Sequence, residues 1–273
     1  MTFAIERRLM FSINSESGNI RMGGDGGDGD LVMFPSGSSN LGDLDEARIH
    51  LDANGGNLWM GGKGADGDVV LFPSTATAMH DTTQASVWLN GQQGNMMLGG
   101  SGRDGDIALF PSDATISQSS FSEATIHLNG DAGDIVLKNA DCAEEFDTAE
   151  PDVESGSVMV LDDEGSLRRS TEAYDTRVAG VVSGAGNYDP GIVLDRQSGP
   201  GQRLPIALMG KVFCRVDATE APVGVGDMLT TAERPGHAME AEDPGRSFGA
   251  VIGKALGALP SGRDLVPVLV SLQ

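Results

Sequence analysis

Pairs of aspartates inside glycine-rich turns are the residues of this sequence whose types and spacing best suit chemistry. The pattern GGxGxDGD occurs at residues 23–30, 61–68 and 99–106. Tight glycine turns expose carbonyl oxygens and the aspartates add carboxylates, and Ca²⁺ prefers about six to eight such oxygen ligands. The pattern therefore offers calcium, and no other cofactor, a candidate site at six aspartates: Asp28, Asp30, Asp66, Asp68, Asp104 and Asp106.

The spacing of these turns leaves a second interpretation open, in which the turns are purely structural. The pattern overlaps GGxGxDxUx, the calcium-binding nonapeptide, but that nonapeptide works in tandem copies. Here one copy occurs in each period of 38 residues. A structural turn and a calcium site therefore stand side by side as alternatives.

Two tryptophans are the candidate contacts for a glycan. Trp59 and Trp88 each occupy the middle position of a triplet whose outer residues are apolar. Because side chains alternate along a strand, both rings are predicted to face away from their apolar neighbours. Exposed aromatic rings can stack on sugar faces, and they can equally pack beneath a loop. His50 and His127 share this position, where we expect exposed surface histidines and not metal ligands.

The sequence contains no motif that nominates an enzyme. A GxSxG nucleophile elbow, a phosphate-binding loop, HExxH and paired CxxC are all absent. We therefore expect a protein without catalytic activity. A run of acidic residues follows the repeats and is interpreted as a solvated linker: Asp141, Glu144, Glu145, Asp147, Glu150, Asp152 and Glu154.

The elements that position the turns and tryptophans recur with a fixed period. Copies of one motif begin at Gly18, Gly56 and Gly94, which lie 38 residues apart, and an altered fourth copy begins at Gly133. A period of this length indicates a repeat architecture. The copies contain short triplets whose outer residues are apolar, which is the alternation of a half-buried strand. In the second repeat, whose first triplet precedes the motif that begins at Gly56, these triplets are 49–51, 58–60 and 69–71.

A single repeat supplies too few apolar side chains to stabilise its short strands alone. Neighbouring repeats or neighbouring chains must cover its faces. We expect a β-prism, in which three parallel chains meet on a threefold axis. The alternative is a monomeric β-solenoid, which would be an adhesin that binds glycans through Trp59 and Trp88. The expected fold class is all-β: a β-prism or β-solenoid shaft of 38-residue repeats, followed by a compact, mostly β C-terminal domain.

The charge and the apolar pattern of the chain argue against several kinds of partner. The 273 residues include 40 acidic and 18 basic side chains, which gives a net charge of -22. Such a surface repels nucleic acid and anionic membranes. No apolar run has the length of a membrane span, and no Sec signal is evident, so synthesis in the cytoplasm is expected.

Cys142 and Cys214 are expected to be small buried thiols, and a disulfide bridge between them is left open as an alternative.

Beyond residue 140 the period disappears. Apolar runs such as 178–182 and 265–269 alternate with breakers such as 189–191, which is typical of a compact domain of short strands. The predicted domains are therefore residues 1–140, a glycine-rich β-repeat shaft of four copies, and residues 141–273, a compact β module.

The C-terminal module resembles a known group of proteins in the order of several motifs: DCAEEFD, RVAGVVSG, PIALMGKVFCRV, VGVGDMLTTAERPGHAM, FGAVIGKAL and VPVLVSLQ. This order resembles the C-terminal modules of phage tail-fibre and neck-appendage proteins, and the resemblance covers roughly residues 139–273. It implies a homotrimeric, surface-exposed structural protein whose C-terminal module helps the trimer to assemble. Besides further copies of the chain, we expect as partners a cell-surface glycan, through the tryptophans, or a tail or baseplate protein. The implied location is a virion, an injection machine or a cell-surface appendage.

The same resemblance raises the possibility of self-cleavage. Some neck-appendage relatives cleave themselves just ahead of a D-x-A-E motif, which Asp141-Cys142-Ala143-Glu144 matches. In this chain the preceding residues 137–140 include no serine or threonine that could serve as the nucleophile. We therefore expect an intact chain and retain the self-cleaving assembly domain, with Asp141 and Glu144 beside the cleaved bond, as an alternative.

Overall fold

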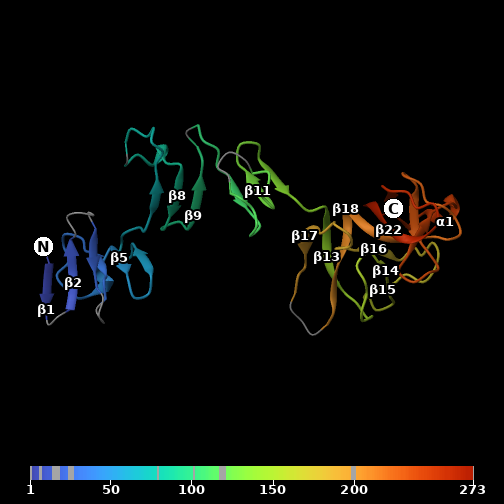
Figure 1. Cartoon of the computed structure of the whole chain (residues 1–273), viewed down its shortest axis with the longest axis horizontal. Helices are drawn as coiled ribbons and strands as arrows, with labels where there is room; N and C mark the ends of the chain where they lie inside the picture. Colours follow the sequence, from blue (N-terminus) through green and yellow to red (C-terminus); the bar gives the residue numbers. More distant parts are fainter. Residues whose placement is uncertain are drawn as a thin grey trace. The chain divides into compact units, whose positions relative to one another are not determined.

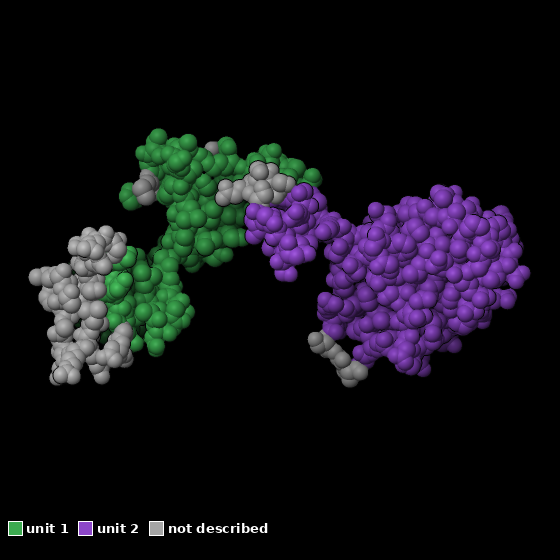
Figure 2. Space-filling view, viewed as in Figure 1, with its two compact units in different colours: residues 1–107, 128–134 green, residues 108–127, 135–273 purple. Residues whose placement is uncertain are grey.

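The computed structural model describes residues 2–5, 8–13, 19–23, 28–78, 80–100, 102–116, 121–197 and 201–272. The described residues are almost entirely strands, turns and loops, which confirms the predicted all-β class. Contacts divide the chain into two compact units, coloured separately in Figure 2: Met1–Ile107 with Leu128–Asp134, and Ala108–His127 with Ile135–Gln273.

Short strands form at each predicted triplet of the repeats. Between them, the loops contain two short 3-10 helices, η1 (Leu44–Glu46) and η2 (Thr82–Gln84). The strands are β1 (Thr2–Ile5), β2 (Arg8–Ile13), β3 (Ile20–Met22), β4 (Leu31–Met33), β5 (Ile49–Asp52), β6 (Asn57–Met60), β7 (Val69–Leu71), β8 (Val87–Asn90), β9 (Asn95–Leu98), β10 (Ile107–Leu109), β11 (Ile126–Asn129) and β12 (Asp134–Leu137).

The second, third and fourth of the three-stranded sheets each combine parts of two repeats, whereas the first joins β1 to strands of the first repeat. The sheet orders are β1-β2-β3, β4-β5-β6, β7-β8-β9 and β10-β11-β12, so the third strand of one copy pairs with the first strand of the next. In the second sheet Leu51 lies opposite both Leu31 and Leu58. His50 lies opposite Trp59 in the same sheet. Register and alternation thus place the apolar positions on one face and the variable positions on the other.

The apolar faces of the repeat sheets are open in the single chain. Leu58 is 53% exposed and Met96 is 57% exposed, and the other large apolar residues of β4 to β9 are partly or largely exposed. Among the hydrophobic side chains whose burial the structure describes between residues 19 and 140, only those of the loop residues Ala47 and Ala85 are buried. The repeats therefore hold almost no core of their own.

The C-terminal part of the chain is built from one branched sheet and a single short helix, α1 (Pro244–Ser247), in the described region. Figure 1 labels several of these elements. The strands are β13 (Asp141–Asp147), β14 (Val158–Leu161), β15 (Leu167–Arg169), β16 (Val178–Val182), β17 (Pro190–Leu194), β18 (Arg203–Ala218), β19 (Met228–Thr231), β20 (Ala238–Glu240), β21 (Val251–Ala255) and β22 (Gly262–Ser271).

Five of these strands close into a barrel. The pairing runs β18-β20-β19-β21-β22, and β22 pairs back with β18 from Met209↔Ser271 to Ala218↔Gly262. Closure leaves the ring without an unpaired edge. Its interior holds fully buried side chains that include Leu229 and Ile252.

The first half of β18 takes part in a second ring. There β18 pairs with β13 and β16, β16 pairs with β14, and β14 pairs with β15. A bridge between Thr148 and Leu167 brings the end of β13 back to β15. Met159, Leu167 and Ile206 fill this ring and are almost fully buried. The 16-residue strand β18 thus links two closed cores.

Candidate functional site

The glycine-aspartate turns are compact and hold themselves together. In the second repeat the amide of Gly62 donates to the carbonyl of Ala65 at 2.8 Å, and the reverse bond measures 3.1 Å. Gly61 has φ +85°, and a Cβ on Gly67 would lie 2.3 Å from the Met60 carbonyl oxygen. The glycines of GGxGxDGD are therefore required by backbone geometry in this repeat, whether or not a cation binds there.

The second aspartate of each turn is a hydrogen-bond acceptor at the end of its sheet. Asp30 accepts from Nε2 of His50 at 2.9 Å and from the amide of Ala53 at 2.9 Å. The bond from His50, followed by the bond from Ala53, lowers the pKa of the Asp30 carboxyl. This carboxylate therefore fixes both the first strand of the second copy and the turn that follows it.

The contact recurs in the next sheets with different donors. Asp68 accepts from Nε1 of Trp88 at 3.0 Å and from the amide of Gly91 at 2.9 Å. Asp106 accepts from the amide of Gly130 at 3.0 Å. In each of these turns one carboxylate oxygen accepts a hydrogen bond from the backbone amide at the equivalent position of the next repeat. These three aspartates therefore have a structural role.

The first aspartates of the turns, Asp28, Asp66 and Asp104, are exposed. Among the residues that the structure describes, no three His, Cys, Asp or Glu side chains converge as a metal site. Calcium at the six aspartates stays a prediction, and an ion at Asp30 would compete with His50 for the same oxygens.

The two candidate glycan residues differ in their surroundings. Trp59 is 60% exposed and lines a hollow of about 750 Å³. Trp88 is half-buried, because its indole donates to Asp68. Of the two rings, Trp59 is the better placed to receive a ligand.

The prediction of exposed surface histidines was wrong. The His50 side chain is only 14% exposed because it is bound to Asp30. The ring of His127 packs against Phe121, with ring centroids 4.5 Å apart. In both cases a neighbouring loop or turn supplies the covering group, which the strand pattern alone does not reveal.

The acidic run after the repeats is part of the folded module, so the prediction of a solvated linker was wrong. Glu145 is buried and lies 3.1 Å from Nε of Arg196, and Asp147 lies 3.3 Å from Nη1 of Arg203. Arginines distant in the sequence neutralise these carboxylates, and so β13 can pair within the sheet.

Asp141, at the start of β13, has the most unusual environment in this run. It is buried, and its Oδ2 accepts from the Ser183 hydroxyl at 2.8 Å while Oδ1 has no hydrogen-bond partner. Burial raises the pKa of Asp141, and the charge of Asp189 adds to the increase. Burial alternates along β13, which places Glu144 on the opposite face. The two carboxylates of the D-x-A-E motif are therefore not paired within one chain.

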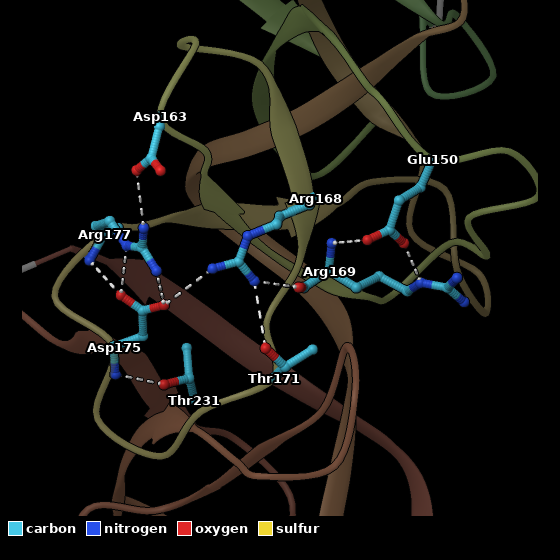
Figure 3. A network of polar contacts seen from close by, with 8 residues as sticks. All are labelled: Glu150, Asp163, Arg168, Arg169, Thr171, Asp175, Arg177 and Thr231. Atoms are coloured by element: carbon cyan, nitrogen blue, oxygen red, sulfur yellow. Dashed lines mark hydrogen bonds and ion pairs between the residues drawn. The ribbon is translucent and has the colours of Figure 1, made fainter.

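A second polar network was not anticipated from the sequence. Figure 3 shows the carboxylate of Asp175 between Arg177 and Arg168, at 3.3 Å and 3.9 Å respectively. The Asp175 amide donates to Oγ1 of Thr231 on β19 at 2.8 Å. Because Asp175 is buried and matched by two guanidinium groups, this network fixes the loop before β16 onto the barrel.

The two cysteines are free thiols in this structure. Burial raises the pKa of Cys214 to about 12. A thiol with this pKa is unreactive at neutral pH, because the thiolate is the nucleophile. In the described residues no helix is long and apolar enough to cross a membrane.

No protein-family model and no curated protein matches the sequence. The chain is similar to a solved structure of the pre-mature bacteriophage phi29 gene product 12, with 15% identity and a TM-score of 0.36. The match covers 54% of this chain and 24% of that one, so this chain spans about a quarter of that protein's length.

Proposed function

We propose that this chain is a structural, non-enzymatic segment of a trimeric fibre or spike, in a phage-like tail, an injection apparatus or a surface appendage. The repeats form the shaft as a β-prism, and the C-terminal module assists assembly. The observation that carries this proposal is the open apolar face of the repeat sheets. In the sheet β7-β8-β9 that face consists of Val69, Leu71, Val87, Leu89, Met96 and Leu98.

Further copies of the same chain are the occupants that fit these faces best. Each repeat presents the same pattern, so parallel chains in register place like residues against like on a threefold axis. Burying apolar surface contributes roughly 25 cal/mol per Å², and large exposed apolar patches mark interaction surfaces. A monomeric solenoid would cover each face with its next coil, whereas Leu58 and Met96 are open in the single chain.

The opposite face of each sheet suits the outside of such a shaft. It carries the variable positions, where Trp88 is held by Asp68. Because Asp30, Asp68 and Asp106 accept bonds at equivalent positions, the turns are fixed in the same way along the repeats. Hydrogen bonds that recur at equivalent positions in successive repeats support the proposal of a stiff shaft.

The C-terminal module offers a separate apolar contact. Phe248 is 92% exposed beside a hollow of about 510 Å³ that Met228 and Val251 also line. A large exposed ring on a domain with two closed cores fits a contact with a second copy. This surface supports the proposed role of the module in assembly.

Sedimentation equilibrium of the full chain tests the proposal. The expected mass is three times 28.3 kDa over a wide range of protein concentration. A single species of 28.3 kDa at every concentration would instead favour the solenoid.

The alternative of a self-cleaving assembly domain rests on one observation. Asp141 is a buried carboxyl with a raised pKa, directly after Ala140 and hydrogen-bonded to Ser183. A group of this kind could donate a proton to a peptide bond. The denatured mass of purified protein decides this point, since cleavage ahead of Asp141 yields two fragments and our main proposal requires the intact chain.

A further inference from the structure

We propose that the second repeat carries a binding site for a carboxylated sugar, formed by Trp59, Arg48 and Lys63. The site goes beyond a structural role for the shaft. It lies where β5 begins and β6 ends, in the hollow of about 750 Å³ lined by these residues together with Asp45, Leu44 and His50.

Trp59 supplies the platform for a sugar ring. Its side chain lies on the face opposite Leu51 and Leu58, which the trimer would bury, and it is 60% exposed. Its cross-strand neighbour His50 is held by Asp30 at 2.9 Å. An indole beside a fixed neighbour can stack on the apolar face of a sugar with little loss of entropy.

Arg48 supplies fixed donors for the carboxylate. Its amide donates to the Met33 carbonyl at 2.8 Å, and its carbonyl accepts from the Gly61 amide at 2.9 Å. Its Nη2 donates to the carbonyl of Lys63 at 3.2 Å. Nη1 is shielded from solvent and has no hydrogen-bond partner. A guanidinium that is anchored through Nη2 and unpaired at Nη1 is suited to bind a carboxylate once a shift of the side chain opens Nη1 to the hollow.

The remaining charges around the hollow complete the recognition. Lys63 is half-exposed, and its Nζ lies 3.8 Å from Glu46, a distance that leaves its other donors available. Asp45 provides an acceptor for sugar hydroxyl groups. Because Glu46 lies near Lys63 and Asp45 also lines the hollow, the preference for an anion rests on the guanidinium of Arg48 together with the remaining donors of Lys63.

The other repeats lack this combination and provide an internal comparison. In the third repeat the positions of Arg48, Trp59 and Lys63 are occupied by Ser86, Met97 and Ser101. The backbone pattern is shared, because Ser86 also bonds to Leu71 and Gly99 as Arg48 does to Met33 and Gly61. The two repeats thus share the same backbone hydrogen bonds, but only the second repeat has the side chains proposed to bind the sugar.

Isothermal titration calorimetry of the full chain with matched sugars tests the site. The probes are sialyllactose against lactose, and a glucuronate oligosaccharide against its neutral glucose counterpart. We expect saturable binding of at least one acidic sugar, at least about tenfold tighter than its neutral partner, since bonds to charged groups are worth more than a factor of ten. Binding should weaken as salt is raised.

Variants assign the binding to these residues. The affinity for the acidic sugar should fall in each of three variants, Trp59→Leu, Arg48→Gln and Lys63→Met. Arg48→Gln should also abolish the preference for the acidic sugar over its neutral partner. Met97→Leu, at the position of Trp59 in the third repeat, should leave binding unchanged. Circular dichroism identifies any variant that fails to fold, in which case Lys63→Met, on an exposed side chain, carries the test. Absence of binding to both acidic sugars, or binding unaffected by these variants, would overturn the proposal.

Discussion

The two regions of this chain differ in how much apolar surface they bury within a single chain. In the C-terminal module, strands from distant parts of the sequence close into rings, and residues such as Leu229 and Met159 are fully buried within one chain. In the repeats, open sheets leave Leu58 and Met96 more than half exposed. The C-terminal module thus encloses its cores within one chain, and the contrast fits our proposal that the repeats are stabilised by other chains.

The largest effect should come from charges on the apolar face of the repeats. We expect the double variant Leu58→Glu, Met96→Glu to abolish the trimer, because three copies would bring six carboxylates together in an apolar interior. Size-exclusion chromatography with light scattering should then report 28.3 kDa. Met97→Glu, on the opposite face, should keep the trimer, and an unchanged mass in the double variant would refute the comparison.

A cavity in the closed barrel should destabilise the C-terminal module alone. Leu229→Ala removes a fully buried side chain and is expected to cost about 2–5 kcal/mol. Thermal unfolding followed by circular dichroism should show a lower Tm that does not vary with protein concentration. Val225→Ala, at a largely exposed position, is the control and should change stability by less than about 0.5 kcal/mol.

A methyl group in a repeat turn should have a smaller effect that is confined to the shaft. A Cβ at Gly67 would lie 2.3 Å from the Met60 carbonyl oxygen, so Gly67→Ala is expected to cost about 1–3 kcal/mol. Hydrogen exchange should show faster opening of β6 and β7 and no change in β18. Gly37→Ala, where no atom lies within 4 Å of the added Cβ, should be neutral. Equal exchange in both variants would show that the close approach is unimportant.

The smallest effects are two pH dependences of opposite sign. The lowered pKa of Asp30 gives stability that is present above its ordinary pKa and is lost as the pH falls through the folded value. Asp30→Asn should therefore lower Tm at pH 7, and the difference from wild type should shrink in acid.

Asp141 has a raised pKa, so its contribution is present below its ordinary pKa and is lost as the pH rises through the folded value. Asp141→Asn should therefore raise Tm at pH 7, and the gain should vanish below about pH 4. Melting curves from pH 3 to 8 compare the two variants. Parallel pH profiles would contradict the environments described for these carboxylates.

The sequence allowed the local elements to be predicted, but not the contacts between them. The apolar triplets and glycine turns appear as strands and turns because both depend on neighbouring residues. The pairing of β4 with β5 across a repeat boundary, and the acceptor role of Asp68, depend on residues about 20 positions apart. The prediction of a linker at the acidic run failed for a similar reason, since the partner of Asp147 is Arg203. Trp59 was found from its position in the triplet, while the contribution of Arg48 required the structure.

Disulfide cross-linking across the proposed threefold axis tests the central claim most directly. In a background with Cys142→Ser, Met96→Cys would place a thiol on the apolar face, and Met97→Cys would place one on the opposite face. After mild oxidation, a non-reducing gel should show covalent dimers for Met96→Cys and only the 28.3 kDa chain for Met97→Cys. Single chains for both variants, or equal cross-linking of both, would contradict the assembly of this shaft from three chains in register.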